Sequence, residues 1–487
     1  MSAESVSVRR GLYADSVTLM QMSRDLGHAD GVTAALVAMA TDLNLDVLRD
    51  LGFSQPETTS ANDLVIAVRA HDEKTLVAAI AAAERLFDAR QRDQGVEDDR
   101  RVPPRTMSAA IRAAGPGVAV ISIPGQHAFT EAMDAVESGC DVHLFSDNVT
   151  VDQEVVLKEA ARQRGLLVMG PDCGTSVIGG IAVGFGHTVE PGPVGIVAAS
   201  GTGAQQVMCL LDTAGVGISD VLGVGGRDLS EAVGGRSTLT ALTRLEADDR
   251  TELIMVISKP PSPSVAERLR VFSAGLRKPV EFALLGYDGS DLTAATERVL
   301  VRLGAPVPVW PSWIAPTKPV AGAVRGLFCG GTLCEEAILV ATPRLGRIRS
   351  NIPLPFDGPL GPSLRAPGHV MIDFGDDALT RGRAHPVIDP TLRNQFLKVA
   401  LTDAATGVVQ MDVLLGHSAH PDPVGELVPL IVGAPRPIVV TLVGARRDPQ
   451  DLGSSAYRLR SAGASVFTSN AEATRYAVSL ATADAAR

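Results

Sequence analysis

The sequence predicts an α/β protein with several doubly wound, parallel-sheet domains and a small α/β domain at its N-terminus. Short apolar runs of strand length alternate with amphipathic segments of helix length over most of the chain. Apolar residues make up 45% of the 487 positions, and glycine (48) and proline (31) are frequent, which suits substantial cores joined by many short connections. At roughly 150 residues per domain, the length allows about three full-sized domains.

The small predicted domain covers residues 1–92. Its expected strands are 5–13, 32–40 and 63–70, and its expected helices are 16–26 and 73–93. Asp15 is expected to cap the first helix. A polar stretch, "QRDQGVEDDRRVPPR" (91–105), is expected to be a linker.

Three further domains are predicted at 108–187, 192–304 and 324–487, with a proline-rich linker at 304–319. The strands expected in them are 117–125, 140–146, 166–171, 194–200, 217–226, 252–258, 279–286, 369–377, 407–416, 437–445 and 464–469. Helical segments lie between these runs, and one of them, 127–139, ends at a glycine. This alternation is typical of parallel sheets with helices on both faces.

The composition indicates which partners and which cellular location to expect. The net charge of -11 argues against nucleic acid as the main partner, although a small anion can still bind to local donors. Five scattered cysteines without a CxxC pair indicate a reducing compartment, so a cytoplasmic location is expected. No signal peptide is evident, and no apolar run approaches the ~18 residues that span a membrane.

One turn has the features of a phosphate site. Ser200, Gly201, Thr202 and Gly203 follow the apolar run 194–199 and open a helical segment. Such a turn exposes backbone N–H groups at the positive end of a helix, where a phosphate can bind. Small residues after a buried strand also allow tight packing, so both interpretations stay open.

A second turn has the same character. Gly330, Gly331 and Thr332 follow "GLFC" and open another helical segment. Two helix N-termini directed at one anion would each contribute on the order of 1 kcal/mol. We therefore hypothesise that the two turns converge in space.

A glycine-rich loop, 222–235, follows a predicted strand and carries Gly225, Gly226, Arg227 and Asp228. It is either a substrate loop beside the phosphate turn or a mobile connection. It is not a Walker A loop, since GxxxxGK[ST] does not occur. A GxGxxG in a strand–helix context is also absent.

Basic residues gather in "TRGRAHPVIDPTLRNQ" (380–395). Arg381, Arg383 and Arg393 could bind carboxylate or phosphate groups, and His385 could act as a general acid or base. A solvated loop with a structural histidine is the alternative. Metal binding by Asp373–Asp377, or by His417 and His420, is weakly indicated because no complete ligand set is evident, and no metal or cofactor is predicted.

Several of these strings together resemble the FdrA family, a fused relative of succinyl-CoA synthetase. The strings are "FSDNVTVDQEVVLKEAARQRGLLVMGPDCGTS", "GIVAASGTG", "GGRDLSEAVGG", "SKPP" and "HPVIDPTLRNQ". Residues 108–304 resemble the synthetase α subunit, and 324–484 resemble the C-terminal ligase domain of the β subunit. The resemblance implies that the two turns correspond to the helix N-termini that face the phosphorylated centre of the synthetase.

The chain also departs from the synthetase pattern. The segment 288–300, "DGSDLTAATERVL", lacks the histidine that carries the phosphoryl group in the synthetase. Lys259, in "SKPP", replaces the glutamate that supports that histidine. The CoA-binding glycine loop has no clear counterpart in 1–92, and the nucleotide-binding half of the β subunit is missing.

The resemblance implies phosphate-dependent carbamoyl transfer. FdrA-like proteins are associated with anaerobic allantoin breakdown, in which oxalurate and phosphate give oxamate and carbamoyl phosphate. Lys259 and His385 are then the predicted catalytic residues. The predicted phosphate and substrate ligands are Ser200, Gly201, Thr202, Gly203, Gly225, Gly226, Arg227, Gly330, Gly331, Thr332, Arg381, Arg383 and Arg393.

Two other functions remain open. One is an ADP-forming acyl-CoA synthetase, which would need CoA, a nucleotide site and a transfer histidine. The other is a non-catalytic assembly subunit. The expected partners are a small anionic substrate (carbamoyl phosphate, phosphate or a carboxylate), subunits of the same pathway, and further copies of the chain.

Overall fold

The computed structural model describes residues 3–482, apart from 13, 15, 57, 94–103, 288, 353–359 and 381–382. Its residues divide into two compact units. The first comprises Met1–Ala114, Ser122–Pro124 and Thr380–Ala384, and the second comprises Gly115–Ile121, Gly125–Leu379 and His385–Arg487. None of the described helices is long and apolar enough to cross a membrane.

The first unit is built on a three-stranded antiparallel sheet with strand order β1-β3-β2. Its elements are β1 (Ala3–Arg9), α1 (Ser16–Gly27), β2 (Val32–Met39), α2 (Asp42–Asp50), β3 (Leu64–Ala70), α3 (Glu73–Asp93) and α4 (Met107–Ala114). Leu64, Ile66 and Val68 on one face of β3 join a core with residues of α1 and α3, and Val65 and Ala67 on the other face join one with α2. The predicted small N-terminal α/β domain is confirmed. The expected cap Asp15 and most of the expected linker lie outside the described residues.

The second unit begins with a small parallel sheet of strand order β4-β5-β6. Its elements are β4 (Val118–Ile121), α5 (Gly125–Glu137), β5 (Asp141–Leu144), α6 (Val151–Gln163) and β6 (Val168–Met169). Helix α6 starts at a capping box, in which Thr150 and Gln153 bind each other's backbone N–H groups.

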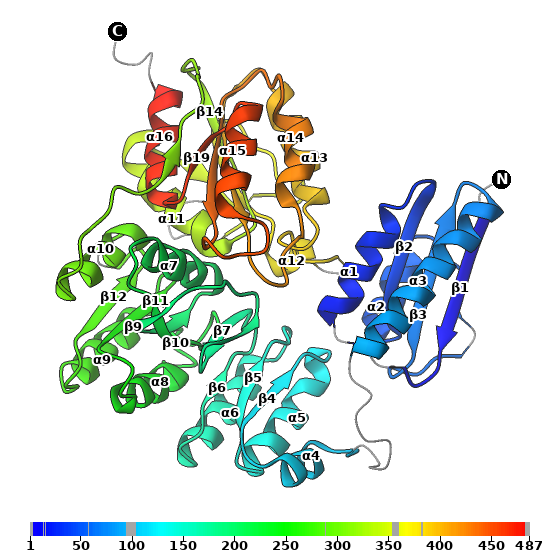
Figure 1. Cartoon of the computed structure of the whole chain (residues 1–487), viewed down its shortest axis with the longest axis horizontal. Coiled ribbons are helices and arrows are strands. Elements are labelled where there is room, and N and C mark those ends of the chain that lie inside the picture. The colour runs from blue at the N-terminus through cyan, green and yellow to red at the C-terminus, as the bar shows by residue number, and fades with distance from the viewer. Residues whose placement is uncertain are drawn as a thin grey trace. The chain divides into compact units, whose positions relative to one another are not determined.

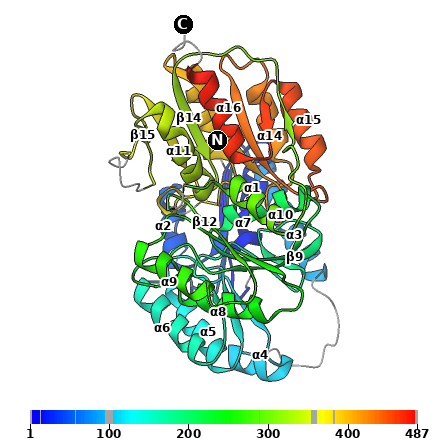
Figure 2. The same cartoon turned by 90° about the vertical axis from the view of Figure 1, so that its left-hand side faces the viewer.

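A six-stranded sheet follows, in the order β12-β11-β9-β10-β7-β8. Its elements are β7 (Thr175–Ile178), β8 (Ile181–Gly184), β9 (Pro191–Ala199), α7 (Gly201–Thr213), β10 (Ile218–Gly223), α8 (Arg236–Ala247), β11 (Leu253–Ser258), α9 (Pro263–Ser273), β12 (Val280–Leu284) and α10 (Leu292–Arg302). The strands from β12 to β10 are parallel, and helices cover both faces, with α7 and α10 on one side and α8 and α9 on the other (Figures 1 and 2).

The third sheet of this unit has seven strands in the order β13-β19-β18-β17-β14-β16-β15. Its elements are β13 (Ser312–Trp313), β14 (Ala323–Phe328), α11 (Gly331–Leu345), β15 (Ile348–Arg349), β16 (His369–Asp373), α12 (Asp377–Thr380), α13 (Thr391–Thr402), β17 (Thr406–Leu414), α14 (Pro423–Ile431), β18 (Ile438–Val443), α15 (Leu452–Ala462), β19 (Ser465–Phe467) and α16 (Asn470–Thr482). All neighbours are parallel except β13 and β19. Figure 1 shows α11 and α16 on one face and α13, α14 and α15 on the other. The predicted class of α/β domains with parallel sheets is confirmed.

Strand register determines which side chains meet at the ends of these sheets. Ala199 at the end of β9 pairs with Ser258 at the end of β11, so the next residues, Ser200 and Lys259, are neighbours. In the seven-stranded sheet, Phe328 of β14 pairs with Asp373 of β16. Ligands of open parallel sheets bind at these carboxyl ends, where the strand order reverses.

Candidate active site

The two predicted turns meet at one point in the second unit. Ser200 is the N-cap of α7, and the backbone N–H of Gly203 donates to its hydroxyl over 2.9 Å. The same hydroxyl lies 2.7 Å from the hydroxyl of Thr332, in the first turn of α11. The N-termini of α7 and α11 are therefore joined by a buried hydrogen bond between Ser200 and Thr332. The hypothesis that the two turns converge agrees with this geometry.

Glycines at the start of α11 make this close approach sterically feasible. A Cβ atom on Gly330 would lie 2.8 Å from the side chain of Thr202. A Cβ atom on Gly331 would lie 2.6 Å from Asp373 Oδ2 and 3.1 Å from Lys259 Nζ. Real Cβ atoms do not tolerate the shorter distances. A larger residue at either position would push apart the groups that converge here.

Several amide groups at the junction are left for a ligand. Helix α11 has no side-chain cap. Within the described part of the chain, the N–H groups of Gly201, Thr202, Gly331 and Thr332 have no hydrogen-bond acceptor. Gly201, Thr202 and Gly331 are also only partly buried. Amides of this kind, at the positive ends of two helices, favour an anion.

Asp412 fixes the turn before α11 through hydrogen bonds to its backbone. Its carboxylate accepts hydrogen bonds from the N–H groups of Cys329 (2.6 Å) and Gly330 (2.9 Å). Arg393 Nη1 donates to the Asp412 carbonyl oxygen (2.7 Å) and to Cys329 Sγ (2.8 Å). Arg393 was predicted to bind substrate, but it is only 2% exposed, and its hydrogen bonds instead stabilise the turn before α11.

Lys259 lies among three carboxyl groups. Burial alone would lower the pKa of Lys259, but attraction by Glu335, Asp373 and Asp172 outweighs it and raises that pKa. Its ammonium group forms no hydrogen bond or close ion pair with any residue that the structure describes. A partly buried cation is thus available beside the junction of α7 and α11.

The three carboxyl groups around Lys259 hold protons near neutrality. Burial raises the pKa of Asp373 to about 7, although Lys259 opposes the shift. Burial likewise raises the pKa of Glu335 to about 7 against Lys259, and one oxygen of this buried side chain has no partner in the described residues. Burial, together with the negative charge of Asp377, raises the pKa of Asp172 to about 7. Groups of this kind can donate or accept protons at physiological pH.

His385 lies close to this cluster. A Cβ atom on Gly375 would lie 2.7 Å from His385 Nε2 and 3.1 Å from Asp373 Oδ1. The His385 ring stands 5.9 Å from that of Phe185, and burial lowers its pKa to about 4, so the ring is neutral. Its Nδ1 accepts from the N–H of Val387 (3.3 Å), which leaves the proton on Nε2.

The glycine-rich loop lies against the end of β6. Gly225 has a φ of +86°, and a Cβ atom there would lie 2.5 Å from the carbonyl oxygen of Pro171. Arg227 donates to the carbonyl oxygen of Val149 (2.8 Å) and pairs with Glu154 (3.0 Å), and its side chain stays 44% exposed. Gly226, next to it, is exposed.

A buried ion network fixes this loop. The ammonium group of Lys158 is fully buried and donates to Glu154 (2.7 Å), Asp228 (2.8 Å) and the carbonyl oxygen of Val224 (2.8 Å). Asp228 also accepts from the N–H and hydroxyl of Thr238 at the start of α8. The loop is therefore anchored, in contrast to the mobile connection that the sequence left open.

The structure does not place the two remaining predicted ligands, Arg381 and Arg383, relative to this cluster. Arg381 lies outside the described residues. Arg383 is exposed and belongs to the first unit, whereas the cluster belongs to the second. A role for either arginine in substrate binding stays a prediction. Among the described residues, no group of three or more His, Cys, Asp or Glu side chains could hold a metal ion.

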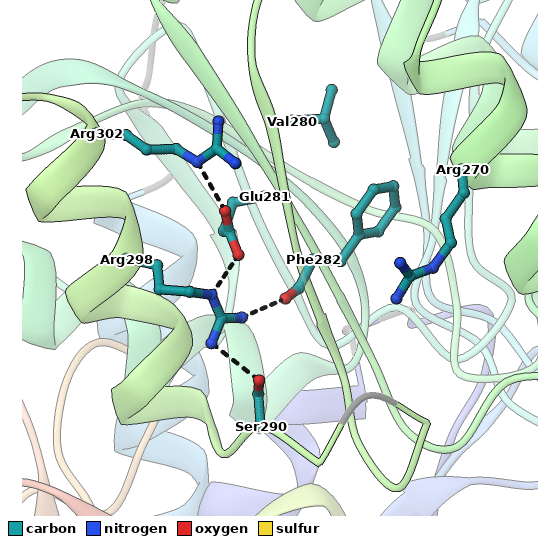
Figure 3. A pocket seen from close by; sticks show the side chains of 7 residues that line it. All are labelled: Arg270, Val280, Glu281, Phe282, Ser290, Arg298 and Arg302. Atoms are coloured by element: carbon teal, nitrogen blue, oxygen red, sulfur yellow. Dashed lines mark hydrogen bonds and ion pairs between the residues drawn. The ribbon is translucent and has the colours of Figure 1, made fainter.

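A pocket of about 310 Å³ lies elsewhere, along the edge strand β12 (Figure 3). Arg298 and Arg302 reach Glu281 from one side, and Arg270 stands on the other side of Phe282. Arg298 also donates to Ser290 (2.9 Å). None of the predicted site residues lines this pocket, and its guanidinium groups are largely occupied by Glu281 and the backbone.

Sequence reasoning missed three carboxyl groups of the site. Asp373 was considered only as a metal ligand, Asp172 only as part of a resembling string, and Glu335 not at all. Asp373 is the last residue of the parallel strand β16, and Asp172 lies three residues after the end of β6, and this position was the available signal. Glu335 lies on the second turn of α11, and nothing in its local sequence singles it out.

Comparison with known proteins relates the chain to CoA ligases. Residues 327–480 match the family described as CoA-ligase, and residues 1–103 match the family described as AllF, heavy metal-associated domain. The chain is 37% identical over 449 residues to the uncharacterized protein YahF of Escherichia coli K12, covering 88% of this chain and 87% of YahF. It is 26% identical over 208 residues to the malate–CoA ligase subunit alpha of Methylorubrum extorquens, covering 41% of this chain and 67% of that subunit.

Comparison with solved structures gives low similarity scores. An ATP citrate lyase from Methanothrix soehngenii has a TM-score of 0.31 at 18% identity, covering 41% of this chain and 37% of that chain. A dinucleotide-forming acetyl-coenzyme A synthetase 1 from Ca. Korarchaeum cryptofilum has a TM-score of 0.28 at 16% identity, covering 76% of this chain and 83% of that chain.

Proposed function

The chain belongs to the family of Escherichia coli YahF, within the succinyl-CoA synthetase superfamily, and from this we propose that it transfers a carbamoyl group to phosphate. The proposed reaction converts oxalurate and phosphate to oxamate and carbamoyl phosphate, in allantoin nitrogen catabolism. Phosphate would bind directly between α7 and α11, without a phosphorylated histidine. Further subunits and a homo-oligomer are part of the proposal.

The meeting of the two helix N-termini carries this proposal. Unpaired amides, the hydroxyls of Ser200 and Thr332, and the ammonium group of Lys259 together provide donors and positive charge for a phosphate ion. The segment 288–300, which replaces the phosphohistidine loop, contains no histidine. An enzyme that keeps the phosphate ligands and lacks the carrier can use phosphate itself as the nucleophile.

The proposed chemistry needs no group beyond phosphate and oxalurate. An oxygen of hydrogen phosphate attacks the ureido carbonyl carbon, and the new C–O bond forms as the C–N bond to oxamate breaks. The oxamate nitrogen gains one proton, and hydrogen phosphate loses one. Positioned donors would hold phosphate in line for attack and limit the entropic cost of the encounter. Arg227, which keeps an exposed guanidinium beside the Asp172 loop, is the proposed ligand for the substrate carboxylate.

A second candidate is an acid–thiol ligase. The match of residues 327–480 to the CoA-ligase family and the likeness to a malate–CoA ligase subunit favour it. That activity would use the same phosphate site, but it would also need CoA, a nucleotide and a phosphoryl carrier. His385, which is neutral and largely enclosed, would be the candidate carrier.

Calorimetric titration of the purified chain with phosphate, carbamoyl phosphate and CoA tests the proposal. We expect phosphate and carbamoyl phosphate to bind and CoA not to bind. Thr332→Val removes one hydroxyl and keeps the side-chain shape. A hydrogen bond to a charged group contributes about 1.5–3 kcal/mol, so phosphate affinity should fall about 10- to 100-fold.

A matched control exists in the same unit. Ser219 and Thr251 form another buried hydroxyl pair at 2.7 Å, away from the helix N-termini. Thr251→Val should lower stability to a similar extent and leave phosphate affinity unchanged. Tight CoA binding would favour the ligase instead. Equal effects of the two valine variants on phosphate affinity would contradict a phosphate site at Thr332.

A further inference from the structure

Asp373 lies where a bound phosphate and a departing group would meet. Its Oδ2 atom and Lys259 Nζ both lie against Gly331, the first residue of α11. Its Oδ1 atom accepts a hydrogen bond from the N–H of Gly375 (2.8 Å). His385 Nε2 also lies against Gly375. This carboxyl group therefore stands between the positive end of α11, the ammonium group of Lys259 and the imidazole of His385.

The main chain of Asp373 is fixed. Its N–H donates to Asn351 Oδ1 (2.9 Å), and its carbonyl oxygen accepts from Asn351 Nδ2 (2.8 Å). With Oδ1 occupied by Gly375, Oδ2 has no hydrogen-bond donor among the residues that the structure describes. The free oxygen is thus held in place and directed at the junction, as a proton-transfer group requires.

An ionised Asp373 would repel a phosphate ion at this point. The charged or titratable groups that act on it or lie beside it are Lys259, Asp376, Asp412, His385, Cys329 and Cys334. Burial and the negative charges of Asp376 and Asp412 favour a proton on Asp373, and together they outweigh the opposing charge of Lys259. Phosphate would bind most readily when Asp373 is the neutral acid, which can donate a hydrogen bond to it.

We propose that Asp373 is the catalytic acid that protonates the leaving nitrogen of oxamate. The inference rests on the proposed function. As the C–N bond of oxalurate breaks, its electron pair stays on the oxamate nitrogen. That nitrogen takes the proton from the Asp373 carboxylic acid, which becomes a carboxylate and regains a proton from the hydrogen phosphate that forms the C–O bond. In the reverse direction the carboxylate removes a proton from oxamate as its nitrogen attacks carbamoyl phosphate and the C–O bond to phosphate breaks.

The neighbouring groups suit this role less well. Glu335 lies further along α11 and is buried, with no partner for one of its oxygens in the described chain. Asp172 lies in the loop after β6 and interacts electrostatically with Arg227, where it would face the substrate carboxylate. The ring of His385, with a pKa of about 4, is not in the imidazolium form near neutral pH and so has no acidic proton to donate. A carboxyl group with a pKa near neutrality at Asp373 fits both directions of the reaction.

Asp373→Asn keeps the shape and charge of the protonated acid but cannot transfer a proton. Asp403→Asn is the matched control, since Asp403 Oδ1 accepts from the N–H of Ala405 (2.9 Å), two residues on, as Asp373 Oδ1 does from Gly375, while Asp403 pairs with Arg325. Phosphate binding is measured by calorimetry above neutral pH, in two buffers with different protonation enthalpies. Exchange of labelled phosphate into carbamoyl phosphate in the presence of oxamate measures the chemical step.

We expect the wild-type chain to take up a proton when phosphate binds. Asp373→Asn should bind phosphate at least as tightly, lose that uptake and slow exchange at least 100-fold, within the usual range for a lost general acid. Asp403→Asn should behave as the wild type. Two results would refute the role of Asp373 and leave the proposed function intact. One is phosphate binding with the same proton uptake in the wild type and in Asp373→Asn. The other is undiminished exchange in Asp373→Asn. Absence of phosphate binding by the wild type would refute the proposed function as well.

Discussion

Lys259 and the carboxyl groups around it make folding stability depend on pH. The pKa values of Asp373, Glu335 and Asp172 lie at about 7 in the folded chain, above the ordinary range near 4. Between these values the folded state binds more protons than the unfolded state, so the free energy of unfolding falls as pH rises. Lys259→Met removes the charge that stabilises the ionised forms. The free energy of unfolding should therefore fall more steeply with rising pH in Lys259→Met than in the wild type.

Urea unfolding at about pH 5 and about pH 8 measures this effect. Lys278→Met is the control, because the ammonium group of Lys278 binds the carbonyl oxygens of Leu245 and Asp248 and no carboxylate. That variant should lose stability equally at both values. A Lys259→Met protein whose pH dependence matches the wild type would show that Lys259 does not interact with the carboxyl groups.

Sequence reasoning found the polar residues of the two turns but not the acids around them. Ser200 and Thr332 were recognisable because each follows an apolar run and opens a helix. The roles of Asp373 and Glu335 depend on burial and on their distance from Lys259, which comes from another sheet. No local pattern contains that information. The resemblance identified Lys259 only through the glutamate that it replaces.

At the scale of elements, Gly331 at the start of α11 gives a discriminating test. Alanine is the better helix former by about 1 kcal/mol, so Gly331→Ala should not destabilise the helix by itself. Its Cβ atom would, however, lie 2.6 Å from Asp373 Oδ2 and 3.1 Å from Lys259 Nζ. We expect phosphate affinity to fall at least tenfold, as calorimetry can measure.

Gly453 in the first turn of α15 is the matched position. A Cβ atom there would lie 3.5 Å from Asp451, an ordinary contact. Gly453→Ala should raise stability by up to ~1 kcal/mol and leave phosphate binding unchanged. If both alanine variants bind phosphate like the wild type, the close approach at Gly331 does not shape the site.

Most helices and parallel strands could be predicted from periodicity, and the exceptions have physical reasons. The hairpin of β7 and β8 was missed because its strands are short, although Gly179 and Gly180 at its turn, with φ of +59° and +82°, are typical of tight hairpins. Strand β14 was missed because Arg325 and Gly326 interrupt its apolar run. The first unit shows that helix and strand patterns alone do not distinguish an antiparallel sheet from a parallel one.

At the scale of the whole second unit, the site depends on the alignment of two sheets from distant parts of the chain. Ser200 belongs to the six-stranded sheet and Thr332 to the seven-stranded sheet. A further buried contact between these parts is made by Asp448, whose carboxylate lies 2.6 Å from His187 Nδ1 and accepts from the N–H groups of Thr188 (2.9 Å) and Ala445 (2.7 Å). The sequence could not predict this pair because its members are separated by 261 positions.

Asp448→Ala should therefore weaken both the fold and the site. Removing one member of a buried pair costs about 3–5 kcal/mol. Burial opposes ionisation of Asp448, but its hydrogen bond and electrostatic interaction with His187 prevail and lower the pKa of Asp448. Its contribution is present above the ordinary range of aspartate and is lost as pH falls through the folded pKa, so the loss of stability should shrink in acid. Phosphate affinity should fall as the two helix ends separate.

Urea unfolding at neutral and acidic pH, with phosphate titration, tests this prediction. Asp422→Ala is the control, since Asp422 pairs with Arg458 at the surface and caps α14 within the seven-stranded part. A surface pair and a helix cap together contribute about 1–2 kcal/mol, and phosphate affinity should not change. An Asp448→Ala chain that loses stability yet binds phosphate like the wild type would show that the alignment of α7 and α11 is set locally, by the bond between Ser200 and Thr332, and not by the wider contact between the two sheets.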